Sequence, residues 1–186
     1  MISIRDASAP DIASIEAVRR ASWRAAYAGL IGQAYIDRAT SASSGPAQLP
    51  AWRRTLVAVE DSGPAVVGYA SFGPERAVHS YVVAPAAPPG NPPRFTHAGG
   101  AGQVGELYAM YVHPASWSTG AGRALMGTAV AGLTAAGYER AVLWVLEENA
   151  RARRFYEIAG WKPDGTSNRL SSLGGVIETR YARPLS

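Results

Sequence analysis

Cysteine is absent from this chain of 186 residues. The absence excludes disulfide bonds and any mechanism that carries an acyl group on a cysteine thiolate. The Gly-x-Ser-x-Gly pattern of a serine nucleophile elbow is absent too. No apolar run approaches the ~18 residues of a membrane span, and charges at Arg5, Asp6 and Asp11 interrupt any signal-peptide core. We therefore expect a cytoplasmic protein that does not bind a membrane.

Lysine is almost absent, since Lys162 is the only lysine among 18 basic residues. A nucleotide-hydrolase phosphate loop ends in Gly-Lys-Ser or Gly-Lys-Thr, so this class is excluded. The net charge is +4, but the arginines are scattered along the chain. Their one cluster, Arg151, Arg153 and Arg154, is interpreted as a solvated helix face. We expect no nucleic-acid partner.

Metal-ligand spacing is missing around all three histidines, and no metal site is expected. The length and the 47% hydrophobic content predict one folded domain over residues 1–186. Residues 84–103 are rich in proline and glycine. We interpret them as an inserted surface loop, because an apolar strand follows at once.

The most informative segment starts with that strand. Residues 104–112 are apolar on both faces, which predicts a central strand. A turn containing Gly120 and Gly122 follows, and a helix-forming run begins at Arg123. The first N–H groups of such a helix bind anions, and a side chain on either glycine would hold the anion away from the backbone. The segment therefore predicts a phosphate or pyrophosphate site.

Hydrophobic periodicity predicts an α/β (α+β) fold in the order β-α-α-β-β-β-α-β-α-β. We place the last strand, 176–181, at an edge of the sheet, where pairing with a second copy would give a homodimer. The expected strands cover 2–6, 55–60, 66–72, 104–112, 141–146 and 176–181, and the expected helices lie around 11–27, 35–36, 123–137 and 149–159.

Two kinds of ligand fit the glycine turn at this point. Gly120-Ala121-Gly122 supplies the first two glycines of a dinucleotide fingerprint, although Leu125 stands where the third belongs. The rest of the chain is too short for a complete dinucleotide fold, so this stays an alternative. Acyl-coenzyme A, whose pyrophosphate needs the same cradle, is the other ligand.

Two blocks carry a resemblance to a known family. Residues 111–125, Tyr-Val-His-Pro-x-x-Trp-x-x-Gly-x-Gly-Arg-Ala-Leu, resemble the coenzyme-binding motif of the GNAT superfamily of N-acetyltransferases. Residues 143–161 resemble a second block of that family, and the opening 2–7 is also similar. Trp117 departs from the pattern, because many members carry Gln or Arg there.

The resemblance implies a GNAT-like fold with a central mixed, mostly antiparallel sheet and flanking helices. It implies direct transfer of an acetyl group from acetyl-coenzyme A to a primary amine of a small molecule or of a peptide or protein. A non-catalytic acyl-coenzyme A-binding module remains an alternative.

Two residues are candidates for proton transfer. Glu106 lies in the apolar strand, where an isolated carboxylate would have a raised pKa suited to a general base. A position near the strand's exposed start, or pairing with an arginine, fits equally well. The resemblance favours the base. The helical period places Tyr156 in the core, whereas the resemblance implies that it protonates the leaving thiolate.

The resemblance also implies the coenzyme contacts. Asn149 is expected to cap a helix and to bond the pantetheine chain. Trp23 and Tyr27 share a helix face and are expected in the core or in the acceptor pocket. Backbone groups of Met110, Tyr111 and Val112 would pair with the pantetheine, and the pyrophosphate would be held by Ser118, Thr119, Gly120, Ala121, Gly122 and Arg123.

Overall fold

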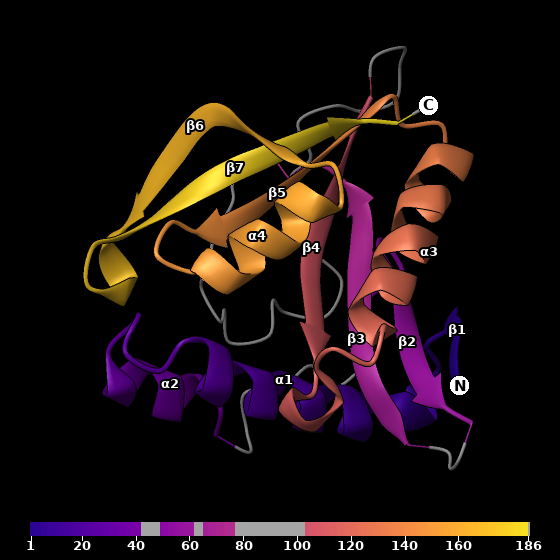
Figure 1. Ribbon diagram of the computed structural model, residues 1–186, viewed down its shortest axis with the longest axis horizontal. Coiled ribbons are helices and arrows are strands. Elements are labelled where there is room, and N and C mark those ends of the chain that lie inside the picture. The colour runs from indigo at the N-terminus through magenta and orange to yellow at the C-terminus, as the bar shows by residue number, and fades with distance from the viewer. Residues whose placement is uncertain (42–48, 62–64, 77–102, 186) are drawn as a thin grey trace.

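The computed structural model describes residues 1–41, 49–61, 65–76 and 103–185, which form one seven-stranded sheet (Figure 1). Its strand order is β1-β2-β3-β4-β5-β7-β6. Every described strand pair is antiparallel except β4–β5, so the expected mixed, mostly antiparallel sheet is confirmed. The strands are β1 (Ile2–Asp6), β2 (Arg54–Glu60), β3 (Val66–Pro74), β4 (Val104–Val112), β5 (Arg140–Leu146), β6 (Lys162–Leu170) and β7 (Val176–Pro184).

Helices flank the sheet on both faces. Figure 1 shows α3 (Ala121–Ala135) and α4 (Ala150–Ile158) on one face, while α1 (Ile12–Ala26) and α2 (Gln33–Ala39) lie on the other. Short 3-10 turns precede α1, follow β4 and link β6 to β7. None of the described helices is long and apolar enough to cross a membrane.

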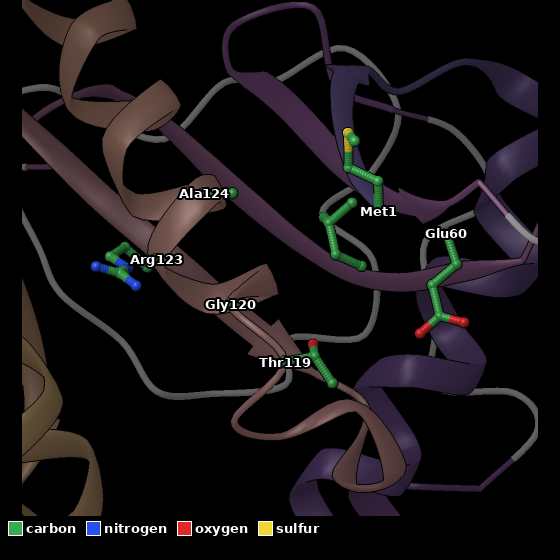
Figure 2. Close-up of a pocket in the computed structure, with 7 residues that line it drawn as sticks. Met1, Glu60, Thr119, Gly120, Arg123 and Ala124 are labelled. Carbon is green, nitrogen blue, oxygen red and sulfur yellow. The ribbon is translucent and has the colours of Figure 1, made fainter.

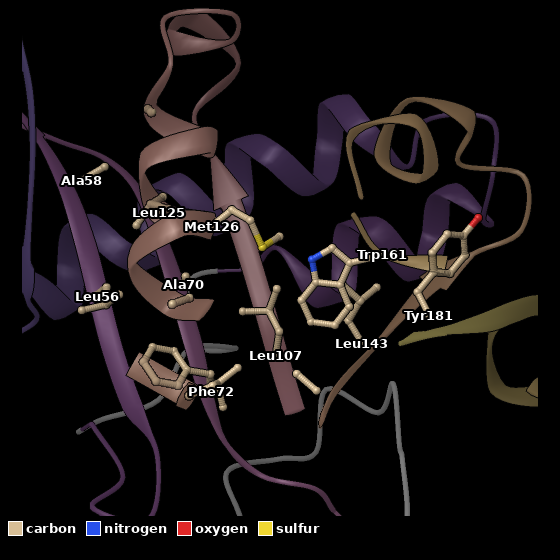
Figure 3. Packing of buried hydrophobic residues seen from close by; sticks show 14 of the residues in the cluster. Leu56, Ala58, Ala70, Phe72, Leu107, Leu125, Met126, Leu143, Trp161 and Tyr181 are labelled. Atoms are coloured by element: carbon tan, nitrogen blue, oxygen red, sulfur yellow. The ribbon is translucent and has the colours of Figure 1, made fainter. Parts of the chain in front are cut away.

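The alternation of side chains along the strands divides the core into layers. On β2, Leu56 packs under α3, whereas its neighbour Val57 packs under α1. Figure 3 shows the α3 layer, in which Leu125 and Met126 lie against the sheet. The strands β2 and β3 bury side chains on both faces, so they lie between the helix layers.

The sequence analysis missed β6, Lys162–Leu170, entirely. Its sequence, Lys-Pro-Asp-Gly-Thr-Ser-Asn-Arg-Leu, is polar and mostly exposed, so it has no apolar alternation to detect. Pairing with β7 along one side holds it in the sheet. Because β7 therefore lies between β5 and β6, our prediction that 176–181 is an edge strand open to a second copy is wrong.

The parallel pair β4–β5 is short. Pairing runs from Val104↔Arg140 to Leu107↔Leu143 and then stops. Just beyond, the β3–β4 register shifts, so that Tyr108 is left between the pairs that Leu107 and Ala109 make. A bulge of this kind bends its strand and increases the local twist. The second half of β4 thus turns away from β5, as Figure 1 shows.

The proposed inserted loop, 84–103, lies outside the described residues except for Gln103. The assignment of residues 1–186 to one domain also remains a prediction.

Close approach of α3 to the sheet can be tested at two glycines of the same helix. A Cβ on Gly132 would lie 2.7 Å from the buried ring of Phe72, whereas a Cβ on Gly127 would meet nothing within 4 Å. We expect Gly132→Ala to destabilise the fold by about 1–3 kcal/mol through overpacking. Gly127→Ala should stabilise it by about 0.5–1 kcal/mol through helix propensity. Urea unfolding of both variants measures the difference, and equal shifts would contradict this packing.

Candidate functional site

The predicted anion site is built where β4 leads into α3. Gly120, at the N-terminus of α3, has φ +95°, and Ser118 has φ +67°. The N–H of Ala124 donates to Gly120 O at 3.0 Å as the first bond of the helix. The N–H groups of Ala121, Gly122 and Arg123 therefore have no acceptor within the helix. Such groups, at the positive end of the helix dipole, attract phosphate oxygens.

Side chains before the helix hold this turn in place. The indole Nε1 of Trp117 donates to Val112 O at 2.8 Å, and Thr119 Oγ1 donates to Ser116 O at 2.8 Å. The guanidinium carbon of Arg151 lies 3.5 Å from the centre of the Trp117 ring, a cation–π contact that links α4 to the turn. Trp117 thus braces the turn where a polar residue is more usual.

Arg151 and Arg154 of the arginine cluster are exposed, as a solvated helix face predicts, while Arg153 is half-buried. Besides the contact of Arg151 with Trp117, Arg153 donates from Nε to Tyr181 Oη at 3.0 Å and from a terminal nitrogen to Glu147 O at 3.0 Å. Both arginines fix α4 to its surroundings.

A hollow of about 620 Å³ lies beside the turn, on the side of β1 and β2 (Figure 2). Glu60 lines it, and a carboxylate there disfavours a bound anion. Gly122 faces the other way, since a Cβ on it would lie 3.5 Å from the ring of Phe155 on α4. We therefore place no phosphate in the hollow and expect the anion on the α4 side of the turn. The hollow is lined by Met1, Ile2, Glu60, Thr119, Gly120, Arg123 and Ala124.

The hydrogen bonds between β3 and β4 show which residues of β4 face its open edge. The N–H of His113 donates to Val67 O at 2.7 Å, which fixes the alternation of the antiparallel ladder. By that alternation, the main-chain groups of Met110 and Val112 face away from β3, while those of Tyr111 face it. Met110 and Val112 thus keep their expected position at the edge that opens beyond Leu107. Tyr111 contributes to this region through its side chain instead.

Tyr111 lies at the centre of an aromatic group. Its hydroxyl is 3.5 Å from that of Tyr27, and its ring centre is 5.6 Å from that of Tyr69. Tyr27 and Trp23 are each 5% exposed and pack edge to face at 5.0 Å. Core packing, one of their two expected roles, is thus confirmed.

Tyr156 approaches the same region from α4. Burial raises the pKa of its phenol, and the neighbouring Tyr111 raises the pKa further. The phenol therefore stays protonated across the neutral range. The core position expected from the helical period is confirmed, since Tyr156 packs against the main hydrophobic cluster.

Asn149 caps α4, because its side chain accepts a hydrogen bond from the N–H of Ala152 at 3.1 Å. The expected helix cap is confirmed. Asn149 is 9% exposed, so only a small part of its surface is open to a ligand.

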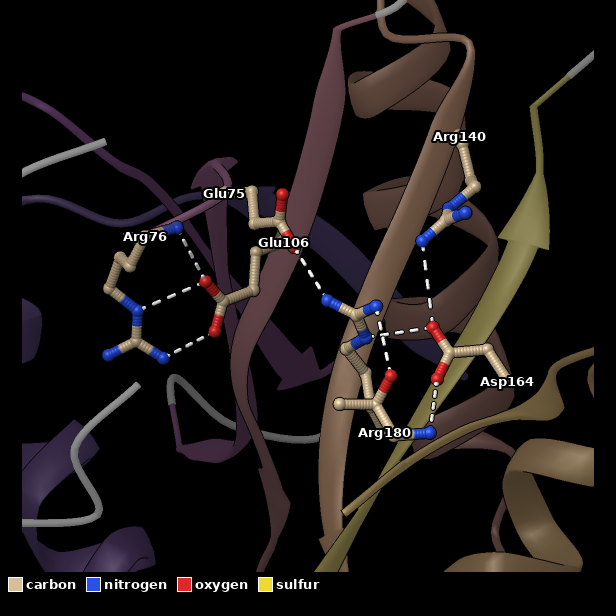
Figure 4. Close-up of polar contacts among 7 residues, drawn as sticks. Glu75, Arg76, Glu106, Arg140, Asp164 and Arg180 are labelled. Carbon is tan, nitrogen blue, oxygen red and sulfur yellow. Dashed lines mark hydrogen bonds and ion pairs between the residues drawn. The ribbon is translucent and has the colours of Figure 1, made fainter. Parts of the chain in front are cut away.

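Glu106 is 1% exposed, as expected, but it is not isolated. The carboxylate accepts hydrogen bonds from the main-chain N–H of Arg76 at 2.9 Å and from Arg76 Nε at 3.1 Å (Figure 4). A terminal nitrogen of the same guanidinium completes the ion pair. The expectation of an isolated carboxylate is wrong, and pairing with an arginine is what the structure shows. These contacts favour the ionised carboxylate.

A second buried acid was missed in the sequence. Glu178 on β7 is 0% exposed and accepts a hydrogen bond from Asn168 Nδ2 at 3.1 Å. On the same face, Arg180 donates to Glu75 at 3.1 Å and to Asp164 at 2.8 Å (Figure 4). The signal was visible, since Glu178 and Arg180 alternate with Ile177, Thr179 and Tyr181 in a predicted strand.

Comparison with known proteins settles the family. The model of the acetyltransferase (GNAT) family matches residues 16–161. The chain belongs to this family. It is similar to the uncharacterized N-acetyltransferase YuaI of Bacillus subtilis, with 28% identity over 176 residues that cover 95% of this chain and 88% of that protein. A mycothiol acetyltransferase of Beutenbergia cavernae is 46% identical over 60 residues, which cover 32% of this chain and 20% of that protein.

Solved structures share the fold. The PaiA N-acetyltransferase of Thermoplasma acidophilum, in complex with coenzyme A, has a TM-score of 0.65 at 19% identity and covers 97% of this chain and 98% of its own. A GCN5-related N-acetyltransferase of Kribbella flavida has a TM-score of 0.63 at 23% identity, covering 99% and 98%. This GNAT member is thus an acyltransferase, and the dinucleotide alternative is wrong.

Alanine substitutions of the two glycines of the turn are expected to have different effects on stability and on coenzyme A binding. Gly120 needs its left-handed backbone, so we expect Gly120→Ala to cost about 1–2 kcal/mol of stability and to weaken coenzyme A binding by distorting the turn. A methyl group on Gly122 would make only ordinary contact with Phe155. Gly122→Ala should therefore keep the melting temperature and lower affinity only through contact with the ligand. Thermal unfolding and calorimetry with coenzyme A separate the two, and unchanged affinity in both variants would contradict the assigned anion site.

Proposed function

We propose that this enzyme transfers an acetyl group from acetyl-coenzyme A directly to a primary amine of a small molecule or of a peptide or protein. The observation that carries the proposal is the parting of β4 and β5 after Leu107 and Leu143, directly before the anion-binding start of α3. A long ligand with a pyrophosphate at one end and a strand-like chain at the other fits that arrangement. The coenzyme A complex of the PaiA acetyltransferase supports this choice of ligand.

The coenzyme would lie along the open edge of β4. Main-chain groups of Met110 and Val112 pair with the pantetheine amides as an added strand would, with the Tyr111 side chain beside them. Asn149 bonds the same chain from the start of α4. The pyrophosphate lies against the turn and the first N–H groups of α3, held by Ser118, Thr119, Gly120, Ala121, Gly122 and Arg123.

The acceptor enters on the face covered by α1 and α2. There the amine nitrogen attacks the thioester carbon, so that a C–N bond forms as the C–S bond breaks. The N–H of Val112 polarises the thioester carbonyl. Tyr27, through its contact with Tyr111, and Trp23 behind it shape the wall of the acceptor site.

Two proton transfers complete the reaction. Glu106 accepts the proton of the amine through water, because a carboxylate can act as a general base when it lies within reach of the amine directly or through one water. Tyr156 donates its proton to the leaving thiolate, because its raised pKa keeps the phenol neutral until charge develops on sulfur. Holding both reactants in line supplies much of the acceleration.

Replacing Tyr156 with Phe should lower kcat by about 100-fold or more, the usual loss of a general acid. The affinity for acetyl-coenzyme A should barely change, because the phenol acts on the leaving group and does not hold the pantetheine. Thiol release and calorimetry measure the two quantities. Tyr138→Phe is a matched control, since Tyr138 packs at the other end of β4 beside Gly105. An unchanged kcat in Tyr156→Phe removes this residue from the mechanism.

Replacing Glu106 with Gln should lower kcat/KM for the amine most at neutral pH. The deficit should shrink as pH rises towards the pKa of an aliphatic amine, about 10.4, because more of the substrate is then already deprotonated. The pH profile of thiol release from pH 6 to 10, at saturating acetyl-coenzyme A, measures this. A deficit that is equal at every pH would instead show that Glu106 only holds Arg76 in place.

A further inference from the structure

Arg53, which directly precedes β2, is half-buried and forms no ion pair with the residues that the structure describes. Its Nε is buried and has no hydrogen-bond partner, and no hydrogen bond from its guanidinium is found within the described ranges of the chain. Its guanidinium carbon lies 5.5 Å from the centre of the Trp52 ring. Burial is the main cause that lowers the pKa of Arg53. Arginine stays protonated all the same, so the charge persists.

The carboxylates near Arg53 are already paired. Glu16 on α1 forms an ion pair with Arg19 at 2.9 Å, and Glu106 forms its ion pair with Arg76. Arg53 contacts the ring of Trp52 and Arg76 contacts the adjoining ring of Tyr108, so the two guanidinium groups lie in the same region. Among the described residues, this face of the sheet thus brings three guanidinium groups together with two carboxylates.

No other acidic side chain can supply the missing charge. All 14 aspartates and glutamates fall within the described ranges, since residues 42–48, 62–64 and 77–102 contain neither. None of the 14 is hydrogen-bonded to Arg53 in the part of the chain that the structure describes. The Nε of Arg53 is buried, and a buried donor without a hydrogen-bond partner costs folding free energy. The arrangement suits an anion that comes from outside the protein.

Arg53 is connected to the proposed catalytic acid through an edge-to-face ring pair and two cation–π contacts. The ring of Trp52 lies 5.3 Å from that of Tyr108, and the guanidinium of Arg76 lies 4.7 Å from the Tyr108 ring. Arg76 in turn holds Glu106. Arg54 lies against Gly132 of α3, and Val57 packs under α1, so alternation along the chain puts Arg53 on the α1 face, from which the acceptor amine enters.

From this juxtaposition we propose that the acceptor is an amino carboxylate, whose carboxylate binds Arg53 while its amine faces Glu106. The inference rests on the proposed function and names the substrate class for the same site. A guanidinium fits a carboxylate with two parallel hydrogen bonds, which gives both affinity and orientation. Binding at Arg53 would thereby favour acceptors in which the spacing between carboxylate and amine places the amine at Glu106.

Matched substrates test the proposal. Linear amino carboxylates of increasing chain length are compared with their carboxamides, which keep the amine and remove the charge. We expect kcat/KM for the carboxylate to exceed that for its amide by about tenfold or more at one chain length, the size of a charge-assisted hydrogen bond. Arg53→Gln should bring the ratio to about one. Equal use of both members of every pair would overturn the proposal.

Arg54→Gln is the control. Arg54 is the next residue and is exposed, and it pairs with Asp6 at 2.6 Å. The Arg54→Gln variant also removes one positive charge, one position away from Arg53, so it should leave the preference for the carboxylate intact. Loss of the preference in both variants would show a general effect of charge and would also overturn the proposal.

A readout without turnover separates this proposal from the proposed function. The amino carboxylate should raise the melting temperature of the wild type more than its amide does, and it should not do so in Arg53→Gln. Arg53→Gln alone should melt no lower than the wild type, because Arg53 forms no ion pair or hydrogen bond with the described residues and its Nε is a buried donor without a partner. If no amine releases thiol, the proposed function fails while the melting shift still tests Arg53. A lower melting temperature for Arg53→Gln, with no ligand dependence in the wild type, would overturn the role of Arg53.

Discussion

The parting of β4 from β5 is the constraint on which the rest of the site depends. A parallel pair normally satisfies the main chain of both strands along their whole length. Here the pairing ends at Leu107↔Leu143, and the register shift at Tyr108 bends β4 away. The main-chain groups of Met110 and the N–H of Val112 face this opening, while Val112 O already accepts hydrogen bonds from Ser22 Oγ and Trp117 Nε1. In the proposed complex an extended ligand chain pairs with the main-chain groups that face the opening.

Around that opening the two faces of the sheet have different chemistry. The α3 and α4 face is apolar except at the helix starts, where backbone N–H groups gather. The α1 face carries ion pairs at the same depth, among them Arg76–Glu106 and Arg19–Glu16. Charges on that face are held in low-dielectric surroundings, where each pair must satisfy its own hydrogen bonds. Arg53 differs from these pairs, because its guanidinium has no carboxylate partner among the described residues.

Sequence reasoning reached the elements whose cause is local. The glycine turn and α3 follow from residues 113–125 alone, and the buried β4 follows from its apolar run. The strand β6 escaped because β7 orders its polar sequence by pairing. The Arg76–Glu106 ion pair escaped because 30 positions separate its members, and only the β3–β4 pairing brings them together. Glu178 was within reach, since an acid at an inward strand position raises the same question as Glu106.

The part of the site proposed to bind the coenzyme and the part proposed to bind the acceptor are built differently. The coenzyme half is formed by consecutive residues and uses mainly main-chain groups, so many side-chain changes leave it intact. Trp117 illustrates this, because its indole braces Val112 O where the family often has Gln or Arg. In the proposed arrangement, the acceptor half is assembled from side chains of α1, β4 and the residue before β2, which are far apart in the sequence. Each of these positions can change independently, so under that proposal acceptor choice depends on remote residues such as Arg53, and the coenzyme motif alone does not reveal it.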